Sequence, residues 1–220
     1  MLSFWPWGMA QLSETLEVAA LAILMFLAVR AVGQNFIVDG DSMRPTFHDN
    51  ELVIVNRLAY IEVDLSWLPW MDEEPWSPFG DPQVGDVVVF EFPGDPGRDF
   101  IKRVIAREGQ TVSIRNGVVF VDGAPLDEPY VPQPCEATGF VQPCGDAWEG
   151  DFPEQTVPEG MLFVLGDNRG NSFDSRSWGM LEEQAVVGRA DLRYWPFDSI
   201  GMVDHHHPEQ AVTVQLSASP

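Results

Sequence analysis

The sequence has little positive charge and almost no lysine. Its 220 residues contain 12 basic and 34 acidic side chains, which gives a formal net charge of −22. A surface this negative repels phosphate backbones and anionic lipid head groups, which argues against nucleic acid as a partner. Eleven basic positions are arginine, and Lys102 is the only lysine. A single lysine can persist by chance, so its surroundings must decide whether it has a role.

Cysteine and histidine are also scarce. Cys135 and Cys144 lie in a polar, proline-containing segment that is typical of a loop. They can form a disulfide or remain free thiols. No second Cys/His pair lies at zinc spacing, so no metal site is predicted, and no other cofactor is expected. Apart from residues 205–207, the chain has one histidine, His48. We interpret residues 205–220 as a polar, solvated tail.

Long apolar runs are missing except near the N-terminus. Residues 16–32 are apolar apart from Glu17 and Arg30. This 17-residue span is at the short limit for crossing a bilayer. No basic residue precedes Arg30, so the basic region that opens a cleaved signal peptide is absent. We expect a short N-terminal segment (1–13) and a transmembrane anchor (14–33). A cleaved signal peptide and a buried core helix are the alternatives.

Turn-forming residues are frequent in the rest of the chain. The 19 glycines and 18 prolines are spread along it, and no internal repeat or low-complexity tract is visible. This distribution suits short strands joined by turns better than a helical bundle. We therefore predict one mainly β domain over residues 34–204.

One serine lies in an irregular connection between two strand-like segments. The connection is "GDSMRPTF", and Ser42 follows a Gly-Asp pair that suits a turn. Such a serine either caps the turn or is exposed to a cleft as a nucleophile. A nucleophilic serine needs a base to take its proton. His48 lies only six residues away in the same connection, so another base must be considered.

Lys102 is the alternative base. It lies in "RDFIKRVIA", an alternating apolar stretch that predicts a strand. Desolvation disfavours the ammonium form, so we expect the pKa of Lys102 to fall from its usual value of about 10.4. Arginine could not serve here because it stays protonated in any protein environment. Strand alternation turns the neighbouring Arg103 to the other face of the sheet.

A third polar segment, "FVLGDNRGNSFDSRSWG", follows another predicted strand. Its Asp, Asn, Ser and Gly residues are typical of turns with many hydrogen-bonding groups. We expect Asp167 to pair with Arg103, and Asp174 to pair with Arg176. Ser172 can hydrogen-bond to the lysine amine and orient it.

Together these segments resemble the type I signal peptidases, membrane-anchored serine proteases that remove signal peptides from exported preproteins. The matching boxes are "GDSMRPTF", "GDVVVFEFPG", "DFIKRVIAREGQTV" and "GDNRGNSFDSRSWGMLEEQAVVGRA", in the family's order behind the anchor. The nucleophile box is closer to the Gram-positive type. Gly40 stands where some members have a serine that helps to bind the oxyanion, so the second oxyanion donor is open.

The resemblance implies a coiled antiparallel β-sheet preceded by a single transmembrane helix. It implies Ser42 as nucleophile and Lys102 as general base, with support from Ser172, Arg103, Asp167, Asp174 and Arg176. The family cleaves after Ala-X-Ala-like sites and binds the substrate extended beside strands, with shallow pockets for the two small side chains. The positions that match these pockets are Phe36, Val38, Met43, Phe47, Val53, Phe100 and Ile101.

The resemblance also implies a cytoplasmic N-terminus and a catalytic domain on the extracytoplasmic face of the plasma membrane. The distribution of basic residues weakly favours the opposite orientation. Arg30 and Arg44 both follow the apolar run, and basic residues are more frequent on the cytoplasmic side of a membrane span. An extracytoplasmic location favours a disulfide between Cys135 and Cys144. Residues 60–82 and 122–158 resemble insertions, and we expect the tryptophans of the first to contact the bilayer interface, namely Trp67, Trp70 and Trp76.

Two other functions compete with this one. A self-cleaving repressor uses serine and lysine on a related β-fold, but it would carry a basic DNA-binding region that this acidic, anchored chain lacks. The second alternative is a catalytically inactive, membrane-anchored β-domain that binds exported proteins. Intact Ser42 and Lys102 argue against that alternative.

Overall fold

The computed structural model describes residues 5–61, 78–131 and 150–208, and within the first helix it describes side chains only for residues 14–26 and Val32. Both expected insertions therefore lie partly outside the described residues. Both cysteines and the three tryptophans of the first insertion lie wholly outside them. The disulfide and the interfacial tryptophans stay predictions.

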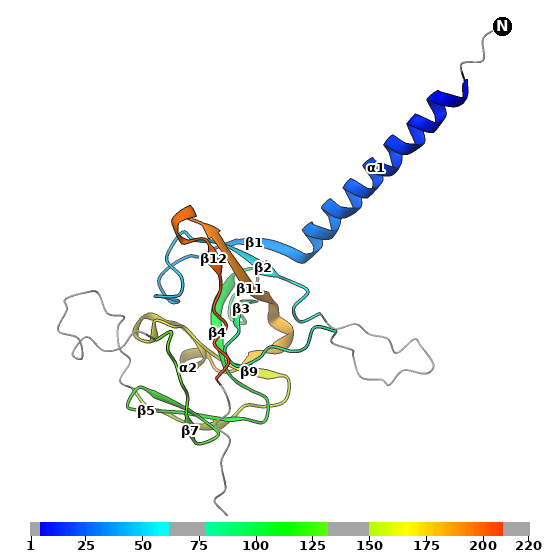
Figure 1. Ribbon diagram of the computed structural model, residues 1–220. Helices are drawn as coiled ribbons and strands as arrows, with labels where there is room; N and C mark the ends of the chain where they lie inside the picture. Colours follow the sequence, from blue (N-terminus) through cyan, green and yellow to red (C-terminus); the bar gives the residue numbers. More distant parts are fainter. Residues whose placement is uncertain (1–4, 62–77, 132–149, 209–220) are drawn as a thin grey trace, which may run out of the picture.

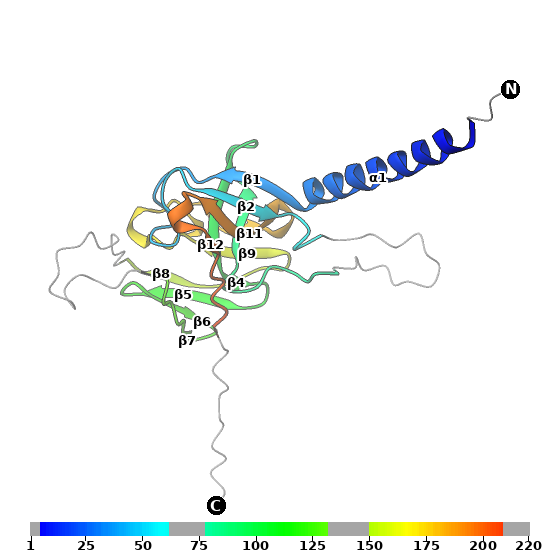
Figure 2. The ribbon, with the colours of Figure 1, turned by 45° about the horizontal axis from the view of Figure 1, so that its top comes forward.

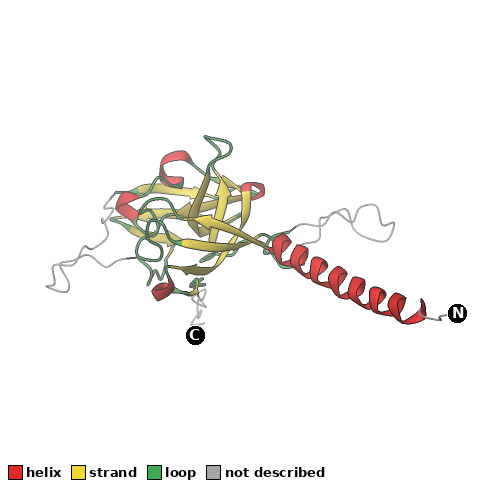
Figure 3. Cartoon of the chain, turned by 90° about the horizontal axis from the view of Figure 1, so that it is seen from above, coloured by secondary structure: helices red, strands yellow, loops and turns green. Residues whose placement is uncertain are grey.

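A long helix, α1 (Trp5–Val32), precedes the β-rich body and projects away from it (Figures 1 and 3). Alanine, leucine and methionine, all strong helix formers, dominate its sequence. Its described large apolar side chains, such as Leu21 and Phe26, are about two-thirds exposed. The alternative of a buried core helix is therefore wrong for this segment. No helix among the described residues combines the length and hydropathy expected of a membrane span.

The body is built from two antiparallel sheets, which confirms the prediction of a mainly β domain. The larger sheet has the strand order β1-β2-β11-β3-β4-β9-β10, and β12 pairs with β11. Its strands are β1 (Gly33–Ile37), β2 (Leu52–Asn56), β3 (Val87–Glu91), β4 (Asp99–Arg107), β9 (Met161–Leu165), β10 (Leu181–Glu182), β11 (Val186–Trp195) and β12 (Gly201–Met202). Register shifts in β4 and β11 mark irregularities of the kind that bend and twist a sheet.

The smaller sheet has the order β7-β6-β5-β8 and lies beside the larger one (Figure 2). Its strands are β5 (Thr111–Arg115), β6 (Val118–Val121), β7 (Ala124–Pro125) and β8 (Phe152–Thr156). Short helical turns follow β9, β10 and β11, namely η2 (Arg169–Asn171), α2 (Ser175–Trp178), η3 (Glu183–Ala185) and η4 (Phe197–Ser199).

Strand β4 separates two hydrophobic clusters, and this separation positions the site. Ile101 packs against a cluster that contains Val38, Val53 and Val89. The adjacent Phe100 packs against a different cluster, which contains Phe90. Neighbouring side chains of a strand point to opposite faces, so the apolar alternation of "RDFIKRVIA" fills both clusters.

The structure corrects the extent of the polar tail. His205 accepts a hydrogen bond from the backbone N–H of Val87 at 3.2 Å, and only 14% of its side chain is exposed. A side chain on Gly85 would collide with the backbone carbonyl of His206, so this glycine permits the close approach of the segment. Residues 205–207 therefore lie against the body: His205 contacts strand β3, and Nδ1 of His207 lies 2.9 Å from the backbone carbonyl of Val84.

Candidate active site

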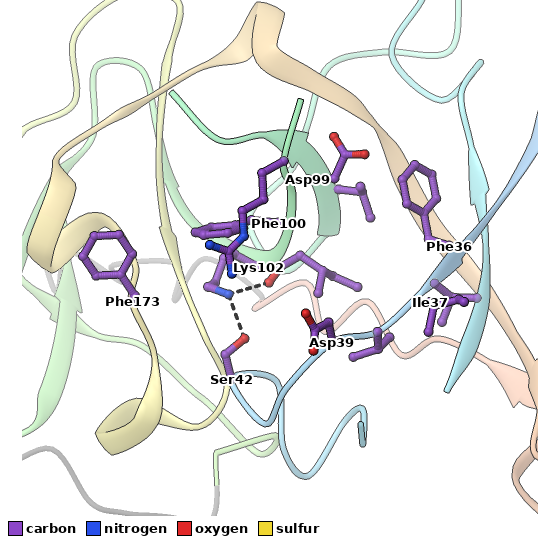
Figure 4. Close-up of a pocket in the computed structure, with 13 residues that line it drawn as sticks. Phe36, Ile37, Asp39, Ser42, Asp99, Phe100, Lys102 and Phe173 are labelled. Carbon is purple, nitrogen blue, oxygen red and sulfur yellow. Dashed lines mark hydrogen bonds between the residues drawn. The ribbon is translucent and has the colours of Figure 1, made fainter. Parts of the chain in front are cut away.

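Ser42 and Lys102 meet at one end of strand β4, although 60 residues separate them in the sequence (Figure 4). The Lys102 Nζ donates to Ser42 Oγ at 2.8 Å and to the backbone carbonyl of Ile101 at 2.8 Å. His48, the only histidine near the serine in the sequence, is exposed. The structure thus places the lysine amine, as predicted, within reach of the serine proton.

Lys102 is buried among apolar side chains. Its side chain lies on the face of β4 that also carries Phe100 and Val104, opposite Val88 of β3, and only 4% of the residue is exposed. Burial lowers the pKa of Lys102 to about 8, and the negative charge of Asp174 acts in the opposite direction. At neutral pH about a tenth of such amines are unprotonated, enough for a general base.

Arg103 points to the other face of β4, as alternation predicts. Its Nε and Nη2 donate to the two carboxylate oxygens of Asp167, each at 2.9 Å, and both side chains are 1% exposed. The predicted pairing is confirmed. Thr46, in the nucleophile connection, donates its hydroxyl to the same carboxylate. Asp167 therefore joins the lysine strand to the serine turn.

The second predicted pair is also present. Arg176 donates from Nε and Nη2 to the carboxylate of Asp174 at 2.7 and 2.6 Å. The same carboxylate accepts from the backbone N–H of Gly166 at 3.1 Å, so it ties the start of α2 back to the end of β9. This buried contact fixes the loop that carries Ser172.

Ser172 lies beside the dyad, but the expected hydrogen bond to the lysine is not formed. Within the described residues its buried Oγ has no hydrogen-bond partner, and the lysine amine bonds to the Ile101 carbonyl instead. An orienting role for Ser172 stays a prediction.

Two further residues hold the nucleophile turn, and sequence reasoning did not single them out. Asn168 donates its backbone N–H to the carbonyl of Ser42 at 3.0 Å and its side-chain amide to the carbonyl of Asp41 at 3.1 Å. Any side chain on Gly166 would collide with Ser42 and Ser172. The "GDN" triplet was visible in the sequence, but only the fold shows that it abuts the serine.

Gly40 has no side chain that could donate a hydrogen bond to the oxyanion. Its φ is +87°, a backbone conformation that strongly favours glycine over serine. Its N–H is already used, since it donates to the Asp49 carboxylate at 2.8 Å. The local backbone therefore explains the glycine in this box and leaves the second oxyanion donor unassigned.

A cavity of about 360 Å³ opens beside the serine and the lysine (Figure 4). Five of the seven predicted substrate-binding residues line it: Phe36, Val38, Val53, Phe100 and Ile101. The other two do not reach it. Met43 and Phe47 are 0% and 1% exposed and pack in the core beneath it. The expectation that Met43 and Phe47 line the substrate pockets is therefore wrong, because the turn directs both side chains into the core.

Besides the apolar strand residues Ile37 and Val89, four further cavity residues were not predicted from the sequence: Asp39, Arg98, Asp99 and Phe173. They lie in hydrophilic or turn-rich stretches, which gave no signal that they would face the serine. Among the residues described, no group of three or more His, Cys, Asp or Glu side chains is arranged to hold a metal ion.

Two strand edges border the cavity. Pairing of β4 with β9 begins only at Arg103, so the edge of β4 before this residue has no strand partner in the described structure. Strand β1 is the outermost strand of its sheet, and its outer edge is likewise unpaired there. Free edges of this kind can bind an extended peptide through main-chain hydrogen bonds.

Fold and site together define a β-rich protein in which a serine hydroxyl and a buried lysine amine lie beside a cavity that two free strand edges border. The family described as signal peptidase, peptidase S26, matches residues 12–195. A probable signal peptidase I-1 of Synechocystis sp. is 34% identical over 206 residues, covering 90% of this chain and 89% of the relative. Signal peptidase I of Bacillus caldolyticus is 34% identical over 194 residues, covering 88% and 90%.

The chain therefore belongs to the signal peptidase family, peptidase S26. The resemblance to type I signal peptidases that its motifs indicated is confirmed, and the chain is a peptidase of the class that removes signal peptides.

Proposed function

We propose that the protein is a membrane-anchored serine endopeptidase that cleaves signal peptides from exported preproteins after Ala-X-Ala-like sites. Ser42 is the nucleophile and Lys102 the general base. One observation carries this assignment: the buried lysine amine, with a pKa of about 8, lies 2.8 Å from the serine hydroxyl. Proximity and a pKa near neutrality are the two properties that a general base needs.

The reaction is an acyl transfer. Neutral Lys102 takes the proton of Ser42 as its oxygen attacks the scissile carbonyl, and the protonated amine then gives this proton to the leaving amine. The new acyl-enzyme is hydrolysed by a water molecule that Lys102 deprotonates in turn. Ser172, next to the dyad, hydrogen-bonds to the amine in the substrate complex. The Ser42 backbone N–H is one donor to the oxyanion.

The substrate binds as an extended strand between the free edges of β1 and β4. The side chains before the scissile bond alternate, so the two small residues of an Ala-X-Ala site point to one face. Phe36, Val38 and Ile101 line that face of the cavity, and in this proposal they admit only small side chains. Larger side chains would have to displace packed core residues, which costs about 1–3 kcal/mol per misfit.

Helix α1 anchors the enzyme in the plasma membrane, with the N-terminus in the cytoplasm and the catalytic domain on the extracytoplasmic face. Support comes from its exposed apolar side chains between Leu16 and Phe26, which contact no part of the body and would be stabilised by lipid. The lipid bilayer and signal-peptide-bearing preproteins are thus the proposed partners, and no nucleic acid is expected.

A direct experiment separates this function from an inactive domain that only binds exported proteins. Detergent-solubilised full chain and its Ser42→Ala variant are incubated with a preprotein that carries an Ala-X-Ala site, and new N-termini are mapped by mass spectrometry. We expect a single cut after the second alanine with the wild type and none with the variant. Binding without cleavage by the wild type would favour the inactive domain.

A further inference from the structure

Arg98 lines the cavity beside the dyad. Seven other arginines in the described part of the chain have a carboxylate within salt-bridge distance, and Arg98 has none there. Arg57 and Arg107 also have none there, but of these three arginines only Arg98 lines the cavity. A guanidinium left unpaired in a binding groove is available to a carboxylate of the substrate.

The Arg98 side chain lies over the ring of Phe100. The guanidinium carbon is 5.3 Å from the ring centroid, and Lys102 Nζ is 5.4 Å from the same centroid. Phe100 is held in place by Phe92, whose ring stacks on it at 4.6 Å with an interplanar angle of 12°. Although Arg98 precedes Lys102 by four residues, its head group is therefore folded back toward the dyad, over a fixed ring.

The face of β4 that carries Phe100 is not the face with the small-residue pockets. Ile101 packs with the cluster under those pockets, whereas Phe100 packs with the cluster on the other side. In an extended peptide, the residue between the two small residues points away from them. Given the proposed cleavage after Ala-X-Ala, the side chain of X therefore points toward Phe100 and the guanidinium above it.

We infer that Arg98 is a specificity-determining residue that favours an acidic side chain at the middle position, X, of the cleavage site. The inference rests on the proposed function and adds a charge preference to it. Besides Lys102, the other charged groups of the cavity are Asp39 and Asp99. Asp99 alternates with Arg98 and Phe100 along the strand, so it belongs to the opposite face and does not compete for the guanidinium. Neither aspartate is within salt-bridge distance of Arg98 in the described structure.

The test uses the full chain in detergent and three preproteins that differ only at X, which is Glu, Gln or Lys. We expect the wild type to cleave the Glu substrate with a higher kcat/KM than the Lys substrate. Arg98→Ala lowers the Glu-to-Lys ratio about fivefold, a size typical of a partly exposed ion pair, and Arg98→Glu lowers it further. Because the ratio is taken within one enzyme, a general loss of activity does not affect it.

A matched control is Arg115→Ala, since Arg115 is an exposed arginine of the smaller sheet and should keep the wild-type ratio. Added salt should reduce the preference by screening. A second series, with the same changes at the first residue after the scissile bond, should show no effect of Arg98→Ala. An unchanged ratio in Arg98→Ala, or an effect only in the second series, would overturn the inference alone. Failure of the wild type to cleave any substrate would overturn the proposed function as well.

Discussion

The backbone N–H of Asn168 donates to the backbone carbonyl of Ser42 at 3.0 Å. A second bond, from the Thr46 hydroxyl to Asp167, joins the same two segments, and Asp167 in turn holds Arg103 of strand β4. The nucleophile turn, the loop after β9 and the lysine strand are therefore linked through Thr46, Arg103, Asp167 and Asn168, none of which lines the cavity. This linkage holds the serine within hydrogen-bonding distance of the lysine.

Removing either member of the dyad should abolish cleavage without unfolding the protein. Ser42→Ala removes the nucleophile, and Lys102→Arg replaces a base that can deprotonate by a group that cannot. We expect each variant to lose at least about 10³-fold in kcat/KM, measured on an Ala-X-Ala preprotein, with circular dichroism as the check on folding. A Lys102→Arg enzyme that keeps a tenth of wild-type activity would contradict the general-base role.

The activity should depend on pH through Lys102. The reaction needs the neutral amine, and burial lowers the pKa of Lys102 to about 8. We therefore expect kcat/KM to rise between pH 6 and pH 9, with its midpoint near 8. The carboxylate of Asp174 raises this pKa, so Asp174→Asn should move the midpoint to lower pH, a shift that lost stability alone would not cause. A flat profile over this range would count against the assignment.

The sequence predicted the parts of the site that depend on residue chemistry and strand alternation. A single lysine in an alternating apolar stretch indicated a desolvated base, and alternation correctly sent Arg103 to the opposite face, where Asp167 holds it. The pairing of Asp174 with Arg176 was likewise visible, because two residues of opposite charge lay two positions apart. These features depend on residues that are close together in the sequence, or on a single assumption about which two segments contact each other in the fold.

Features that depend on how a turn folds in three dimensions could not be predicted. Met43 and Phe47 flank Ser42 in the sequence much as cavity residues would, yet the turn directs both into the core. Nothing in the sequence indicates that the guanidinium of Arg98 lies over the ring of Phe100. The packing of His205 against Val87 also depends on a distant glycine that no sequence pattern connects with it.

Breaking the Arg103–Asp167 pair should destabilise the protein strongly. Both side chains are 1% exposed, so Asp167→Asn leaves a buried guanidinium without its counter-charge. We expect a loss of about 3–5 kcal/mol in the free energy of unfolding, measured by urea denaturation. The exposed pair of Arg115 and Glu154 is the control, because its removal should cost no more than about 1 kcal/mol. Equal losses at the two pairs would contradict the view that burial makes the first pair essential.

The contact between the β9 loop and the nucleophile turn should tolerate no side chain at Gly166. A Cβ there would collide with the backbone carbonyl of Ser42 and with Ser172, so Gly166→Ala must push the serine away from Lys102. A displacement of about 1 Å can cost on the order of 10²-fold in rate, and we expect kcat to fall more than KM rises. Gly201→Ala is the matched control, since nothing lies within 4 Å of its Cβ position. If Gly166→Ala retained the kcat of Gly201→Ala, the close packing of loop and turn would not be what positions the nucleophile.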